Sequence, residues 1–67
     1  MEKPKISFNR RGESGNIFDI AGRAAAELKK IGKDAEAKEM TSRMWQASSY
    51  DEALKIVKEY IDLVEEN

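Results

Sequence analysis

The sequence has 67 residues, with 12 basic and 13 acidic side chains and with neither cysteine nor histidine. A chain of this length buries only about 60% of the surface that its unfolded form exposes, and because disulfides and thiolate metal sites are excluded, we expect self-association to stabilise it. Residues 1–33 hold eight basic and four acidic side chains, whereas residues 34–67 hold four basic and nine acidic ones, and this division argues against general nucleic-acid binding.

A weak strand signal opens the chain, because Lys5–Asn9 alternates polar and apolar residues with Ile6 and Phe8 on one side. A turn follows. The sequence shows no second strand, so this segment is expected to stay extended as an arm, to lie on the helices, or to pair with another copy. We therefore divide the chain into an N-terminal arm and turn, residues 1–13, and a helical domain, residues 14–67.

Apolar residues at helical spacing predict a first helix over residues 16–31. Ser14 or Asn16 is placed to cap its start, and Gly32 is placed to end it in the left-handed conformation. Gly22 lies inside this helix, on a second side made mostly of small residues, where glycine costs about 1 kcal/mol relative to alanine. We therefore expect another helix or a ligand to approach closely at Gly22.

Two further helices are predicted. The second covers residues 35–47 with Asp34 as its cap, and Trp45 lies beside its thin apolar seam in a position that suits either packing or binding. The third starts at a capping box, in which the Ser49 hydroxyl accepts from the Glu52 N–H and the Glu52 carboxylate reaches back to the Ser49 N–H. This third helix is predicted to run to about residue 65.

The third helix shows an unusually wide apolar arc. If residues 53–64 are helical, apolar side chains cover nearly half of the circumference, whereas the usual stripe is little more than about 100° wide. Two short partner helices are too narrow to cover this arc, so part of it is expected to meet another chain, most simply across a two-fold axis. The expected interface residues are Leu54, Ile56, Tyr60, Ile61 and Leu63. The alternative is a monomer in which Ile6 and Phe8 cover the extra face.

These elements together predict an all-α fold: a three-helix domain with a short N-terminal arm or strand, oligomerising through its third helix. No apolar run approaches the length of about 20 residues that a membrane span needs, and the first residues do not lead into the apolar region of a signal peptide. A cytoplasmic location without a membrane partner is therefore expected.

The segment before the first helix is the best candidate for chemistry. It places two arginines, a hydroxyl and an amide ahead of a helix N-terminus, where free N–H groups and the helix dipole attract anions. Arginine side chains in this turn would hold phosphates, Arg23 would help from a neighbouring chain, and Phe18 or Trp45 would stack on a base. The alternative is a solvated turn with an ordinary cap. The candidate ligand-binding residues are Arg10, Arg11, Ser14, Asn16, Phe18, Arg23 and Trp45.

The sequence contains few side chains suited to catalysis. Ser-His and Cys-His pairs are impossible, and no glycine-rich phosphate loop is present. Two carboxylates brought together by the fold are the one alternative left open. We therefore expect a non-enzymatic protein with no catalytic residue, no metal site and no cofactor.

Two blocks, residues 14–18 (Ser-Gly-Asn-Ile-Phe) and 49–54 (Ser-Tyr-Asp-Glu-Ala-Leu), resemble a family of short proteins encoded by phages and prophages of Gram-positive bacteria. The resemblance covers about residues 14–62, and the stretch around Trp45 does not match it. It implies an accessory role such as disabling a host defence, either as an anti-CRISPR-like inhibitor of a protein or as an oligomeric sponge that sequesters an immune nucleotide signal.

The expected function is therefore a homo-oligomer that binds and sequesters a small phosphate-bearing ligand. One alternative is a protein-interaction inhibitor of a host defence enzyme that uses acidic helix faces to mimic nucleic acid. A small transcriptional regulator is a third hypothesis, although no predicted helix concentrates basic side chains on one face. The acidic residues of the second hypothesis are Glu59, Asp62, Glu65 and Glu66.

Overall fold

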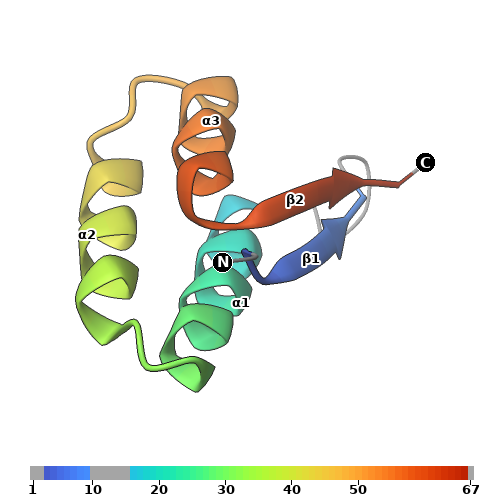
Figure 1. The fold of residues 1–67 in the computed structure, drawn as a ribbon. Helices are drawn as coiled ribbons and strands as arrows, with labels where there is room; N and C mark the ends of the chain where they lie inside the picture. The colour runs from blue at the N-terminus through green and yellow to red at the C-terminus, as the bar shows by residue number, and fades with distance from the viewer. Residues whose placement is uncertain (1–2, 10–15, 67) are drawn as a thin grey trace.

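The computed structural model describes residues 3–9 and 16–66 of the chain. Its elements, in chain order, are β1 (Lys5–Phe8), α1 (Ile17–Lys30), α2 (Asp34–Trp45), α3 (Tyr50–Tyr60) and β2 (Asp62–Glu65). The three helices stand side by side, and the two strands extend away from α1 and α3 on the side opposite α2 (Figure 1). None of the described helices has the length and apolar character needed to cross a membrane.

The ends of α1 follow the local rules of helix capping. The Asn16 side chain accepts a hydrogen bond from the Phe18 N–H at 2.8 Å, so of the two predicted caps, Ser14 and Asn16, it is Asn16 that caps α1. Gly32 has a φ of +78°, and the Lys33 N–H donates to the Leu28 carbonyl at 2.9 Å, so the helix ends at a left-handed glycine as predicted.

The starts of α2 and α3 differ in part from the predictions. Asp34 lies in the first turn of α2, and the capping position is held by Lys33, whose side chain makes no capping bond. Ser49 caps α3 as predicted, since its hydroxyl accepts from the Glu52 N–H at 3.1 Å. The Glu52 carboxylate, however, accepts from the N–H and the hydroxyl of Ser48, so the reciprocal bond lies one residue earlier than in a capping box.

The C-terminal segment is where the sequence-based prediction was wrong. α3 ends at Tyr60, and Ile61 is already extended, with φ −129° and ψ 142°. Asp62–Glu65 form β2, a second strand that was not predicted. Apolar residues at 61, 63 and 64 fit the period of a helix and that of a strand about equally well, so their spacing alone does not separate the two.

β2 pairs with β1 in parallel, with Lys5 opposite Asp62 and Phe8 opposite Glu65. The Asp62 N–H donates to the Pro4 carbonyl at 2.8 Å, and the Glu66 N–H donates to the Phe8 carbonyl at 2.7 Å. The N-terminal segment is thus a strand, as one expectation had it, but its partner is the other end of its own chain. Pairing with β2 gives β1 hydrogen-bond partners for backbone groups that a lone strand would leave unpaired.

The core lies between the three helices and one face of this small sheet. Ile6 and Phe8 point into it from β1 and are 6% and 3% exposed. Its largest fully buried side chains come from all three helices and from the residue that links α3 to β2. They are Ile20, Leu28, Met40, Val57 and Ile61.

An interface along the third helix was expected because its apolar arc was predicted to be too wide for the other two helices to cover. The core of a single chain now covers much of that arc. Leu54 and Ile61 are 4% and 0% exposed within a single chain, so neither is available at its surface. Ile61 and Leu63 are not helical at all, which narrows the apolar arc. Of the five expected interface residues, those left partly exposed are Ile56, Tyr60 and Leu63.

The close approach expected at Gly22 does not occur among the described residues. Gly22 is exposed, and a Cβ added there would meet no atom within 4 Å. Gly32 also has open space around its Cβ position, but its positive φ disfavours any side chain. The two glycines therefore differ in conformation and not in packing.

We expect the same substitution to change stability in opposite directions at these two glycines. Gly22→Ala should raise the free energy of unfolding by about 0.5–1 kcal/mol, because alanine is the better helix former and has room. Gly32→Ala should lower it by about 1 kcal/mol through left-handed strain. Thermal melts monitored by circular dichroism would check both, and equal shifts of the same sign would contradict the assignment of Gly32 as the α1 terminator.

Candidate functional site

Two large aromatic side chains are exposed and touch each other. Phe18, in the first turn of α1, is 70% exposed, and Trp45, the last residue of α2, is 50% exposed. Their ring centroids lie 5.1 Å apart with the planes tilted by 38°. Both residues were candidates on sequence grounds, but only the packing of α1 against α2 brings them together. We call this pair the aromatic surface.

A hollow of about 290 Å³ adjoins the aromatic surface. Its lining is mostly apolar, and the hydroxyls of Ser48 and Ser49 are already bonded at the start of α3. The hollow thus offers contact to an apolar or aromatic group and few free polar groups. Its lining residues are Ile17, Met44, Trp45, Ala47, Ser48, Ser49, Tyr50 and Ala53.

The polar residues predicted to bind an anion differ in what the structure shows of their contacts. Asn16 is engaged as the cap of α1. The Arg23 guanidinium lies 3.5 Å from the Asp19 carboxylate, one helical turn away on the surface of α1. Arg10, Arg11 and Ser14 lie outside the described residues, so their convergence with the aromatic surface stays a prediction.

A second, larger hollow of about 740 Å³ lies against the sheet, and sequence reasoning missed it. Lys3, Lys5 and Lys58 line it together with Ile61, Asp62 and Leu63. The Lys3 ammonium donates to the Lys58 carbonyl at 2.8 Å, near the C-terminal end of α3, where a positive charge is favourable. These lysines come from opposite ends of the sequence, so no local pattern reveals that they are neighbours.

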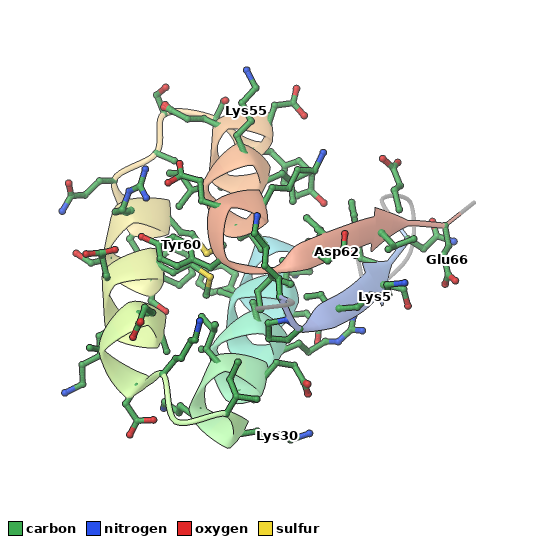
Figure 2. The ribbon with its side chains drawn as sticks, viewed as in Figure 1. Lys5, Lys30, Lys55, Tyr60, Asp62 and Glu66 are labelled. Carbon is green, nitrogen blue, oxygen red and sulfur yellow. The ribbon has the colours of Figure 1, made fainter. Side chains whose placement is uncertain are left out.

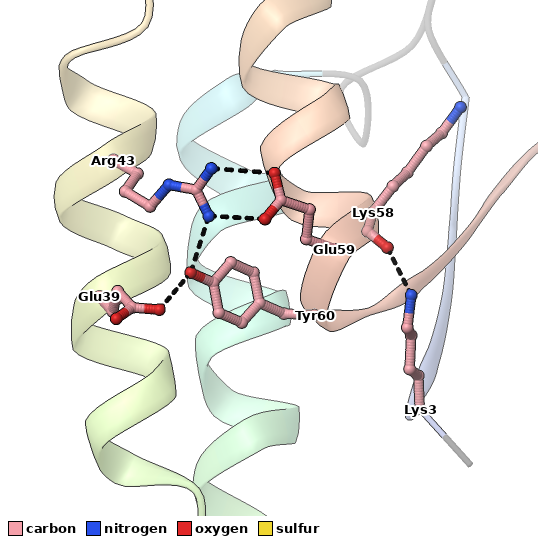
Figure 3. Close-up of polar contacts among 6 residues, drawn as sticks. All are labelled: Lys3, Glu39, Arg43, Lys58, Glu59 and Tyr60. Carbon is pink, nitrogen blue, oxygen red and sulfur yellow. Dashed lines mark hydrogen bonds and ion pairs between the residues drawn. The ribbon is translucent and has the colours of Figure 1, made fainter. Parts of the chain in front are cut away.

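A cluster of four polar side chains links α2 to α3 (Figure 3). The Arg43 guanidinium donates to both carboxylate oxygens of Glu59, at 2.8 and 2.9 Å, and to the Tyr60 hydroxyl at 2.9 Å. The Tyr60 hydroxyl in turn donates to the Glu39 carboxylate at 2.5 Å. These bonds link two side chains of α2, Glu39 and Arg43, to two of α3, Glu59 and Tyr60, so the cluster holds the two helices together.

The contacts in this cluster shift three pKa values. The hydrogen bonds from Arg43 lower the pKa of the Glu59 carboxyl below its ordinary value of 4.5. The same bonds, chiefly the one to Glu59, raise the pKa of Arg43 and keep it charged. Burial, with the hydrogen bond to Glu39, raises the pKa of Tyr60 above its ordinary value of 10.

The acidic residues proposed to mimic nucleic acid do not share one helix face. Glu59 is paired with Arg43 on the side of α3 that faces α2. Asp62 and Glu65 belong to β2, and Glu66 follows that strand. In the described part of the chain, no group of three or more acidic residues is arranged to hold a metal ion.

Comparison with known proteins adds nothing to this picture. No protein-family model matches the chain, and neither the curated proteins nor the solved structures give a match.

We expect Glu59→Gln to weaken the protein at neutral pH and to have less effect in acid. Because the folded-state pKa of Glu59 is lowered, its ion pair stabilises the fold above about pH 4.5 and is lost as the pH falls through the folded value. Melting temperatures of wild type and variant should therefore converge between pH 7 and pH 3. Glu66→Gln, outside the cluster, is the control and should show no such convergence.

Proposed function

We propose that this protein is a non-enzymatic binding protein that sequesters a small ligand carrying phosphate groups and an aromatic base, such as a cyclic nucleotide or an ADP-ribose-derived signal. The observation that carries the proposal is the aromatic surface formed by Phe18 and Trp45. A soluble domain gains stability by burying such rings, so two of them exposed in contact favour a binding role.

The aromatic surface suits a base better than it suits a purely aliphatic ligand. Stacking of a base on an aromatic side chain contributes about 1–3 kcal/mol and needs only a free ring face. The adjoining hollow, at about 290 Å³, is at the lower end of the range for small-molecule sites. Insertion of a base beside Trp45 is therefore compatible with the space present.

Phosphate groups of such a ligand would meet the polar segment of the sequence that precedes α1. Phe18 lies four residues after Ser14, and Arg10 and Arg11 come just before that, so little chain separates these polar groups from the aromatic surface. Arginine pairs with phosphate through two parallel hydrogen bonds. In this proposal Arg10, Arg11 and Ser14 hold the phosphates and the rings hold the base.

We further propose that the protein acts as a homo-oligomer in the cytoplasm of a phage-infected cell. Its small size favours association, and Ile56 and Leu63 stay partly exposed at the rim of the core. Arg23 of one copy would then complete the ligand site of another. This part of the proposal draws on the resemblance to phage proteins and on the size of the chain.

The single tryptophan of the chain provides a direct assay of ligand binding. We expect nucleotides of the proposed class to change Trp45 fluorescence and to raise the melting temperature. Phe18→Ala should weaken binding by about tenfold or more, as the loss of one stacked ring implies. Ile31→Ala is the matched control, because Ile31 is also exposed, at 48%, but lies about 20 Å along α1 from Phe18.

Two outcomes of this assay would contradict the proposed site. A nucleotide panel that changes neither the fluorescence nor the melting temperature removes the proposal. Equal weakening by Phe18→Ala and Ile31→Ala would show that a ligand binds elsewhere, with the basic hollow at Lys5 and Lys58 as the next place to test.

A second candidate function is favoured by the apolar character of the same surface. Exposed tryptophan and phenylalanine beside an apolar hollow are typical of hot spots in protein–protein interfaces. In this alternative the chain inhibits a host defence enzyme by docking through Phe18 and Trp45. Affinity purification from host lysate should then recover one protein in stoichiometric amount, and Trp45→Ala should lose it while Ile31→Ala keeps it.

A further inference from the structure

We propose that the larger hollow, beside the sheet and the end of α3, is a second binding site, and that it takes a small phosphate ester with free hydroxyl groups, such as a sugar phosphate. This inference goes beyond the proposed function, because the hollow shares no lining residue with the one beside Trp45. The observations that carry it are the size of the hollow, its three lysines and the one carboxylate among them.

The three lysines reach the hollow from separate parts of the chain. Lys3 precedes β1, Lys5 is the first residue of β1, and Lys58 lies in the last turn of α3. Pairing of β1 with β2 brings these parts together, since the Asp62 N–H just after α3 donates to the Pro4 carbonyl at 2.8 Å. At about 740 Å³, the hollow is within the range of small-molecule sites.

These lysines differ in whether the fold uses their charge. The Lys3 ammonium donates to the Lys58 carbonyl at 2.8 Å, so it stabilises the C-terminal end of α3 (Figure 3). Lys5 and Lys58 are exposed, and their ammonium groups make no hydrogen bond or ion pair with any residue that the structure describes. Both of these ammonium groups are therefore available to a ligand.

The charge in the hollow favours an anion. Asp62 lies opposite Lys5 in the ladder, and Figure 2 labels both side chains. Three lysines and one aspartate leave an excess of two positive charges, so Asp62 reduces the local charge without cancelling it. Glu59, next to Lys58 in the sequence, is already paired with Arg43. Because neighbouring ammonium groups repel one another, a bound anion would lower the energy of this surface.

Asp62 narrows the class of anion. An ionised carboxylate only accepts hydrogen bonds, so it repels a bare phosphate but binds a hydroxyl group, whereas ammonium groups donate to phosphate oxygens. Leu63 is partly buried and offers apolar contact to a carbon skeleton. This mixture of side chains suits a molecule that carries phosphate and hydroxyl groups on one small skeleton.

Ribose 5-phosphate is a suitable probe, because it has a phosphate and hydroxyl groups but no base to stack on Trp45. Isothermal titration calorimetry of the full chain would compare it with inorganic phosphate and with ribose. We expect ribose 5-phosphate to bind more tightly than either of the other two compounds. Trp45 fluorescence should stay unchanged throughout the titration.

Lysine variants test which side chains hold the probe. Lys5→Gln and Lys58→Gln should each weaken binding by about fivefold or more, because each loses a charge-assisted hydrogen bond. Lys55→Gln is the matched control: it makes the same change in charge at an exposed position of α3 that does not line the hollow. Its affinity should change little at physiological salt, where distant charges are screened. Circular dichroism would check that all variants fold alike.

An aspartate variant tests the hydroxyl contact separately. Asp62→Ala should bind inorganic phosphate more tightly than the wild type does, because a repelling charge is gone. It should also lose most of the preference for ribose 5-phosphate over inorganic phosphate, because the acceptor for the hydroxyl groups is gone.

Four results would overturn the proposal. They are the absence of binding heat with ribose 5-phosphate, equal weakening by Lys55→Gln and Lys58→Gln, equal affinity of the wild type for ribose 5-phosphate and inorganic phosphate, and a change in Trp45 fluorescence with ribose 5-phosphate. The last result would place the probe at the aromatic surface. None of the four decides whether nucleotides stack on Phe18 and Trp45, so the two sites fail or stand independently.

Discussion

Parallel pairing between β1 and β2 joins the two ends of the chain and sets where α3 must stop. The two strands are separated in sequence by all three helices, which act together as the long crossover that parallel strands require. Once the Asp62 N–H is bonded to Pro4, the segment after Tyr60 cannot continue as a helix. Ile6 and Phe8 are then held over the core, and Ile61 completes it from the other strand's side.

The pairing of β1 with β2 also determines which side chains stay exposed on the surface. The apolar arc that a longer third helix would have shown is instead divided between the core and the sheet. What stays exposed is the aromatic surface at the start of α1 and the end of α2, together with the basic hollow beside the sheet. The first offers aromatic ring faces for stacking, and the second is lined by Lys3, Lys5 and Lys58 together with Asp62.

Polar contacts stabilise the frame that holds these surfaces. Arg43 ties α2 to α3 through Glu59 and Tyr60, and Lys3 ties the N-terminal segment to the last turn of α3. Within the described residues no buried side-chain nitrogen or oxygen lacks a hydrogen-bond partner.

Sequence alone determined the features that depend on a few neighbouring residues. The caps at Asn16 and Ser49 and the left-handed Gly32 follow from local backbone chemistry, so the first two helices and the start of the third were predicted close to their observed bounds. Phe18 and Trp45 were named as candidates because large aromatic residues lie off the apolar stripes, but their contact was not predicted. The tertiary structure decided the conformation of residues 61–65 and the meeting of lysines from opposite ends of the chain. Both depend on pairing between distant segments, which local spacing does not encode.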